Sequence, residues 1–149
     1  MMARMSIDMF IDPEHDPRTD PPAQAGERAT LAAFLRRQRD TLELKCSGPD
    51  AADLARRSVD PSTLSLLGLV RHLGDVERGW FRRVIAGQDA PPHFRSAALP
   101  LSRTSAQPHF RSAADPDAAL DRMAAGPALV AEAREVWRAE VAFADRVRG

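Results

Sequence analysis

Apolar side chains recur at steps of three and four residues in three stretches of the chain, which is the spacing of one face of a helix. The stretches lie at about 27–46, 62–86 and 128–147, and each predicts a long helix. Residues 50–57 predict a short connecting helix, and Asp115 with Pro116 begins another helical piece, because these residues are favoured at a helix start. The pattern therefore predicts an all-α bundle.

The middle stretch is the most informative of the three. Ser62 or Thr63 is its predicted N-cap, and His72 lies on the flank of its apolar stripe, beside small residues such as Gly68. This position suits a ligand pocket, and it equally suits a buried histidine hydrogen-bonded to a neighbour. The predicted apolar stripe consists of Leu66, Leu69, Leu73, Val76, Trp80 and Val84.

The other two long stretches also predict a core face. In the first helix, the arginine-rich side opposite the apolar face is expected to be solvated, and Cys46 is expected to pack inertly. Trp80 and Trp137 are both expected to pack between helices. The predicted inner positions are Leu31, Phe34, Leu35, Gln38 and Leu42 in the first helix, and Val130, Ala133, Trp137, Val141 and Ala144 in the last.

The remaining segments are rich in turn formers. Residues 1–25 contain repeated X-Pro pairs and predict an extended N-terminal arm, which leaves 26–149 as the helical domain. The heptapeptide PHFRSAA occurs at 92–98 and again at 108–114, which indicates one in-frame duplication within a long loop at about 88–115. His93 and His109 lack the helical or strand framework of a metal pair, and His15 in the arm is expected to be solvated.

Composition narrows the possible functions. The 21 basic and 21 acidic residues give a net charge of zero, so no overall field draws the chain to nucleic acid or to an anionic membrane. Cys46 is the single cysteine, so an internal disulfide is excluded. No apolar run is long enough for a membrane span, and the N-terminus lacks the plan of a signal peptide. A cytoplasmic location is expected.

Three blocks of sequence carry a family resemblance. These are DPRTDPP from Asp16, ERATLAAFLRRQRDTLELKCSG from Glu27, and SVDPSTLSLLGLVRHLGDVERGWFRRVIAG from Ser58. Together they resemble the DinB-like superfamily, and within it the actinobacterial branch of mini-circle-type proteins. The segment WRAEVAFADRV, from Trp137, resembles the third-helix segment of that family.

The resemblance implies a four-helix bundle in which three histidines bind a divalent metal, zinc or nickel. It also implies transfer or isomerisation of low-molecular-weight thiols, with mycothiol or bacillithiol as co-substrate. His72 maps onto the ligand of the second helix, and Asp75 or Glu77 could orient it or form surface ion pairs. The family's other two ligands come from a histidine pair on a fourth helix, which this chain lacks. We therefore expect a C-terminally truncated or frameshifted relative.

Two hypotheses follow. In the first, the protein is a metal-dependent thiol S-transferase-like enzyme with His72 as a metal ligand; no residue is assigned a catalytic role. In the second, it is a non-catalytic helical module. Such a module would bury its open apolar face against a second copy, as a homodimer, or against a helical partner protein.

Overall fold

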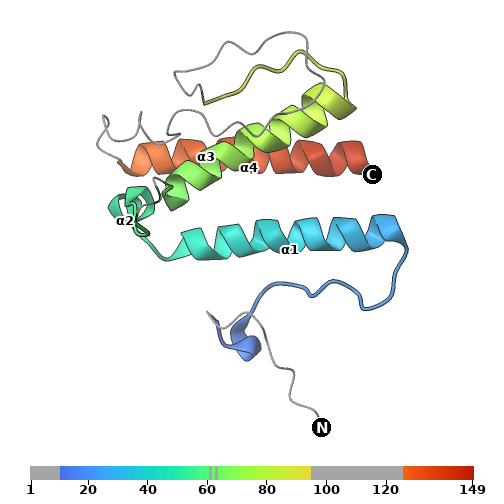
Figure 1. Ribbon diagram of the computed structural model, residues 1–149, viewed down its shortest axis with the longest axis horizontal. Coiled ribbons are helices and arrows are strands. Elements are labelled where there is room, and N and C mark those ends of the chain that lie inside the picture. The colour runs from blue at the N-terminus through green and yellow to red at the C-terminus, as the bar shows by residue number, and fades with distance from the viewer. Residues whose placement is uncertain (1–10, 61, 63, 95–125) are drawn as a thin grey trace. The chain divides into compact units, whose positions relative to one another are not determined.

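A computed structural model describes residues 11–60, 62, 64–94 and 126–149. The predicted Asp115–Pro116 helix and the second heptapeptide lie outside these residues. Within the described part the chain is helical and forms no strand, which confirms the all-α prediction (Figure 1). The elements are η1 (Pro13–His15), α1 (Glu27–Ser47), α2 (Ala51–Ala55), α3 (Leu66–Glu77), η2 (Arg78–Ile85) and α4 (Pro127–Arg148).

The chain forms two compact units, Met1–Ser47 and Gly48–Gly149. In the first unit, the segment before α1 is held to that helix by Arg18, whose side chain is buried. Its guanidinium donates to Asp16 Oδ1 and Oδ2 at 2.8 and 2.6 Å, and to Thr41 Oγ1 on α1 at 2.8 Å. The Arg18 hydrogen bonds lower the pKa of Asp16 to about 2, so the pair is ionised at neutral pH.

The arginine-rich side of α1 is not simply a solvated face, so that prediction was wrong. Arg37 pairs with Asp20 at 2.7 Å, and Arg39 is buried. Leu31 and Phe34, predicted to face inward, are exposed. Arg18 and Asp20 of the preceding segment bind Thr41 and Arg37, so this side of α1 is engaged by polar partners from the chain as well as by water. Leu42 and Cys46 are buried, as expected.

The second unit begins with α2, which confirms the short connecting helix. The next long helix starts later than predicted, because its N-cap is Ser65 and not Ser62 or Thr63. Ser65 Oγ accepts from Gly68 N at 3.0 Å, whereas Ser62 Oγ accepts from Leu64 N in the turn before the helix. A side-chain acceptor at the N-cap satisfies an amide that has no partner inside the helix.

α3 packs on α4 through a face that differs from the predicted one. Its buried residues are Leu67, Gly68, Val70, Gly74 and Glu77. The predicted stripe is half-buried at its four α3 positions, and Trp80 and Val84 are exposed, so their assignment to the core was wrong. The backbones come close at Gly74, where an added Cβ would lie 3.6 Å from Trp137 Cα.

α3 continues directly into η2, a π-helix in which Ala86 N donates to Phe81 O, five residues back, at 3.0 Å. The predicted helix 62–86 is therefore α3 and η2 together. Gly87 ends it with a φ of 64°, a backbone conformation that glycine adopts readily.

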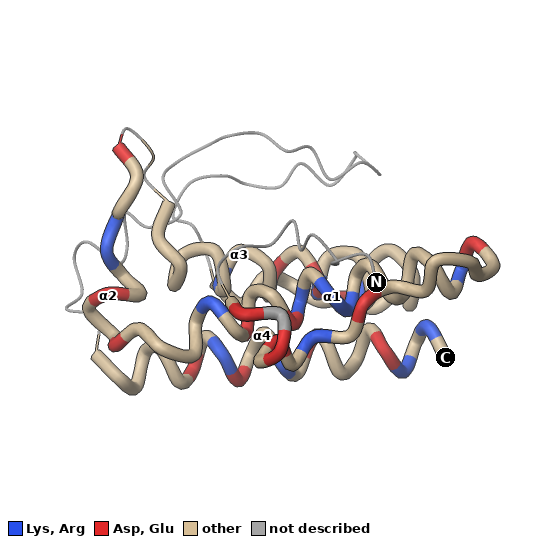
Figure 2. Tube along the Cα trace, turned by 90° about the horizontal axis from the view of Figure 1, so that it is seen from below, with Lys and Arg blue, Asp and Glu red and all other residues tan. Residues whose placement is uncertain are grey.

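α4 presents the buried face that the sequence predicted. Val130, Ala133, Trp137 and Ala144 are buried, and Val141 is half-buried. The same face also buries Glu140, a residue that the apolar pattern did not single out. Acidic and basic residues are interspersed along the helices (Figure 2). Of the helices in the described ranges, none is long and apolar enough to cross a membrane.

Candidate functional site

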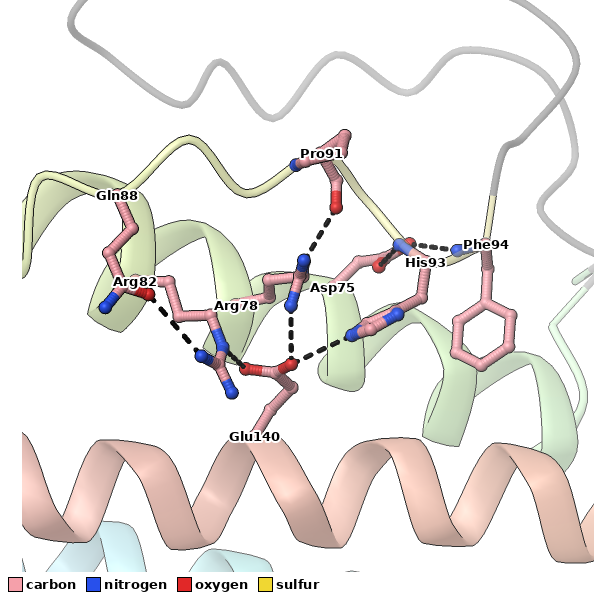
Figure 3. A network of polar contacts seen from close by, with 8 residues as sticks. All are labelled: Asp75, Arg78, Arg82, Gln88, Pro91, His93, Phe94 and Glu140. Carbon is pink, nitrogen blue, oxygen red and sulfur yellow. Dashed lines mark hydrogen bonds and ion pairs between the residues drawn. The ribbon is translucent and has the colours of Figure 1, made fainter.

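A buried carboxylate on α4, that of Glu140, is the centre of a polar cluster in the second unit (Figure 3). The side chain is only 2% exposed. Its Oε1 accepts from Arg78 Nη1 at 2.8 Å and contacts His93 Nε2 at 2.8 Å, while Oε2 accepts from Arg82 Nε at 2.6 Å. A buried carboxylate is tolerated only when such partners replace its water.

The two arginines reach Glu140 because they lie four residues apart in η2, on the side that faces α4. Arg78 Nε also donates to Pro91 O at 2.7 Å. The Arg82 guanidinium stacks 3.9 Å from the centroid of the Phe143 ring, one turn along α4 from Glu140. Each arginine thus connects the cluster to a further part of the chain.

The segment 90–94 docks on the same cluster. Asp75 Oδ1 and Oδ2 accept from the backbone amides of His93 and Phe94 at 2.7 and 3.2 Å. The Phe94 ring lies 4.5 Å below the guanidinium carbon of Arg71, and Ala90 is buried. Side chains of α3 and α4 therefore hold His93 and Phe94 in place near the start of the long loop.

The two carboxylates differ in their electrostatics. Burial raises the pKa of Asp75, and the two backbone amides oppose this shift. Burial also acts to raise the pKa of Glu140, but the hydrogen bonds from His93, Arg82 and Arg78 outweigh it and hold that pKa below its ordinary value. Glu140 is thus a charged structural link, with both oxygens engaged.

His72, the predicted metal ligand, lies on α3 with an exposed side chain. The exposed side chain does not fit the predicted buried or pocket position beside Gly68, although Gly68 itself is buried. Of the residues predicted to orient His72, Asp75 binds the docked segment and Glu77 is buried.

The remaining histidines are placed as follows. His15 is exposed in η1, 3.8 Å from Asp12 Oδ2, in accordance with its predicted solvation. His93 joins the Glu140 cluster, and His109 lies outside the described residues. The Glu140 cluster was missed at the sequence level. The available signal was a glutamate three residues after Trp137, on the inward side of an apolar helix.

A family model for mycothiol S-transferases matches residues 30–148. The chain belongs to the mycothiol S-transferase family. This match spans α1 to α4 and confirms the predicted relationship to DinB-like thiol transferases. No curated protein and no solved structure matches the chain.

The family resemblance implies a divalent metal bound by three side chains. Such a site needs three metal-binding side chains close together in the fold. Across 11–60, 62, 64–94 and 126–149, no three His, Cys, Asp or Glu side chains gather where they could hold a metal ion. The Glu140 cluster does not provide such a site, since its carboxylate is already bound by two arginines and His93. The described residues do not fit a three-ligand metal centre.

Replacing Glu140 by Gln tests the structural role of the cluster. The change keeps the size of the side chain but leaves Arg78 and Arg82 facing a neutral amide, so we expect the free energy of unfolding to fall by about 3 kcal/mol. Urea unfolding at pH 7 measures this loss. The exposed Glu135 on the same helix is the control, and Glu135→Gln should change stability by less than about 0.5 kcal/mol.

The pH dependence gives a second check on this variant. Because the pKa of Glu140 is lowered from 4.5, its ionised form stabilises the fold fully above about pH 4.5, and this advantage is lost as the pH falls through the lowered value. The stability gap between the natural chain and Glu140→Gln should therefore narrow in acid. A gap that stays constant from pH 7 to pH 3 would contradict the assignment.

Proposed function

We propose that this member of the mycothiol S-transferase family is a non-catalytic helical module that associates with a second copy of itself. The association uses the apolar side of α3 and η2 that does not pack on α4. The observation that carries the proposal is the exposed row on η2, where Trp80, Val84 and Ile85 are 44%, 56% and 57% exposed.

The row continues an apolar stripe along α3. Val84 and Ile85 follow Trp80 by four and five residues, so they share one side of a helix whose hydrogen bonds span five residues. Half-buried leucines and a valine extend the stripe toward the start of α3; they are Leu66, Leu69, Leu73 and Val76. An exposed apolar patch of this kind, on a protein otherwise rich in charge, is typical of an interaction surface.

The net charge of the chain favours a second copy as the partner that covers this apolar surface. The chain has no net charge, so two copies do not repel one another at long range. An apolar helix face can also pair with itself around a two-fold axis, because each residue then meets an equivalent apolar surface. Arg83, which is exposed beside Val84, would lie at the polar rim of such an interface.

Association can be tested by sedimentation equilibrium across a range of protein concentrations. We expect a concentration-dependent dimer, and we expect the variant Trp80→Glu with Val84→Glu to be monomeric but folded, because charges would be placed in the interface. Val59→Glu is the matched control: Val59 is also an exposed apolar residue but lies outside the row, so this variant should dimerise normally. A natural chain that stays monomeric and unfolds cooperatively at every concentration sinks the proposal.

A metal-dependent thiol S-transferase is the second candidate function. Two observations favour it: the family match, and the exposed side chain of His72 on α3. The thiol co-substrate would be mycothiol, which gives the family its name. No catalytic residue can be named, since the described donors do not make a metal centre.

Metal content separates the two candidates. After growth with added zinc or nickel, the proposed module should contain much less than one metal ion per chain, and His72→Ala should contain the same amount, because a single histidine lacks the chelate needed for affinity. Elemental analysis of both purified proteins measures this. One ion per chain that is lost in His72→Ala, together with mycothiol transfer activity, would favour the enzyme and reject the module.

A further inference from the structure

The docking of segment 90–94 defines an acceptor site made of Arg71, Asp75, Arg78 and Glu140. All four side chains come from α3, η2 and α4, and Figure 3 shows three of them with the docked residues. The site holds the short segment 90–94, whose backbone bends at His93 and Phe94. It is therefore a small peptide-binding site, occupied by the protein's own chain.

The acceptor site uses a limited set of groups on the docked peptide. Asp75 accepts hydrogen bonds from the backbone amides of His93 and Phe94, and Arg78 donates one to the backbone carbonyl of Pro91. From side chains it uses the His93 ring, which meets Glu140, and the Phe94 ring, which lies under Arg71.

The chain contains every one of these groups a second time. Residues 90–98 read APPHFRSAA and residues 106–114 read AQPHFRSAA. The two copies differ only where Gln107 replaces Pro91, and there the acceptor site uses the backbone carbonyl, which both residues have. The two side chains that the acceptor site contacts, His93 and Phe94, are thus repeated as His109 and Phe110.

We propose that the acceptor site binds either copy, with residues 106–110 replacing 90–94. The connection between η2 and α4 then has two registers, sixteen residues apart. In one register the longer part of the connection follows the docked peptide, and in the other it precedes it. The contacts with Arg71, Asp75, Arg78 and Glu140 are the same in both.

The chain is long enough for this exchange. The docked Phe94 ring lies beside Gly74, where an added Cβ would be 3.7 Å from Phe94 Cε2 and 3.6 Å from Trp137 Cα. Trp137 is about 15 Å along α4 from Pro127, at the rise of an α-helix. Residues 111–126 can span about 50 Å when extended, so the second copy reaches the site while α4 stays in place. The longer loop on the other side costs little, because closure entropy grows slowly with length.

Thermal unfolding of the full chain tests the proposal through three variants. His93→Ala with Phe94→Ala removes the first copy, His109→Ala with Phe110→Ala removes the second, and the four-site variant removes both. Each pair alone should lower Tm by only about 1–2 °C, because one of two equivalent bound registers remains. The four-site variant should lower Tm by about 5 °C or more, well beyond the sum of the pairs.

A chain with a single copy is the matched control. Deleting residues 92–107 or residues 99–114 gives the same sequence, in which one heptapeptide follows Pro91. This chain should fold with a Tm at least equal to that of the natural protein. In it, changing the remaining His-Phe pair to Ala should cost as much as the four-site variant does.

Nuclear Overhauser contacts identify the occupant directly. In the His93→Ala, Phe94→Ala variant, the Gly74 Hα protons should contact the ring of Phe110, which has replaced Phe94. The proposal is overturned if that contact is missing. It is also overturned if the first pair alone lowers Tm as much as all four substitutions or prevents folding, or if the two pairs are simply additive.

Discussion

The burial of one carboxylate, that of Glu140, is the constraint on which the second unit depends. An ionised carboxylate can leave water only if donors replace its hydration, and Glu140 obtains them from η2 and from the segment that follows it. These donors lie far from Glu140 in sequence. The cluster therefore fixes how the end of the α3–η2 helix and the start of the loop lie on α4.

The shape of the α3–η2 helix is consistent with this constraint. α3 buries apolar residues and Gly74 against α4, whereas η2 directs Arg78 and Arg82 toward it and leaves Trp80 in solvent. In η2 the hydrogen bonds span five residues, which changes the angular spacing of its side chains relative to α3. The predicted stripe already misses the buried face within α3, where the buried Leu67, Val70 and Gly74 each follow a stripe residue by one position. Extended at α-helical spacing into η2, the stripe also misses the side from which Arg78 and Arg82 reach Glu140.

Much of the fold could be predicted from the sequence because the helix signals are local. Apolar spacing located the long helices, and the structure begins α4 at Pro127 and ends η2 before Gly87, residues that are typical of such boundaries. The buried faces were harder to predict, since they depend on which polar groups find partners: Arg39, Arg18 and Glu140 are buried, while Phe34 and Trp80 are exposed. His72 stood out from its place on the helix, and its role as a metal ligand was inferred from resemblance to a family. The His93–Glu140 pair required the fold, because 47 residues separate the partners. The chain belongs to the mycothiol S-transferase family, but its described donors form a structural cluster and do not fit a three-ligand metal centre.

A double-mutant cycle between Glu140 and Arg82 tests most directly whether this cluster organises the unit. The free energy of unfolding is measured for the natural chain, Glu140→Gln, Arg82→Gln and the double variant. If the two side chains act as a buried pair, the double variant is less destabilised than the sum of the single changes, and the coupling energy is about 1–3 kcal/mol. A coupling energy below about 0.5 kcal/mol would mean that the residues act independently, and it would contradict the central role assigned to Glu140.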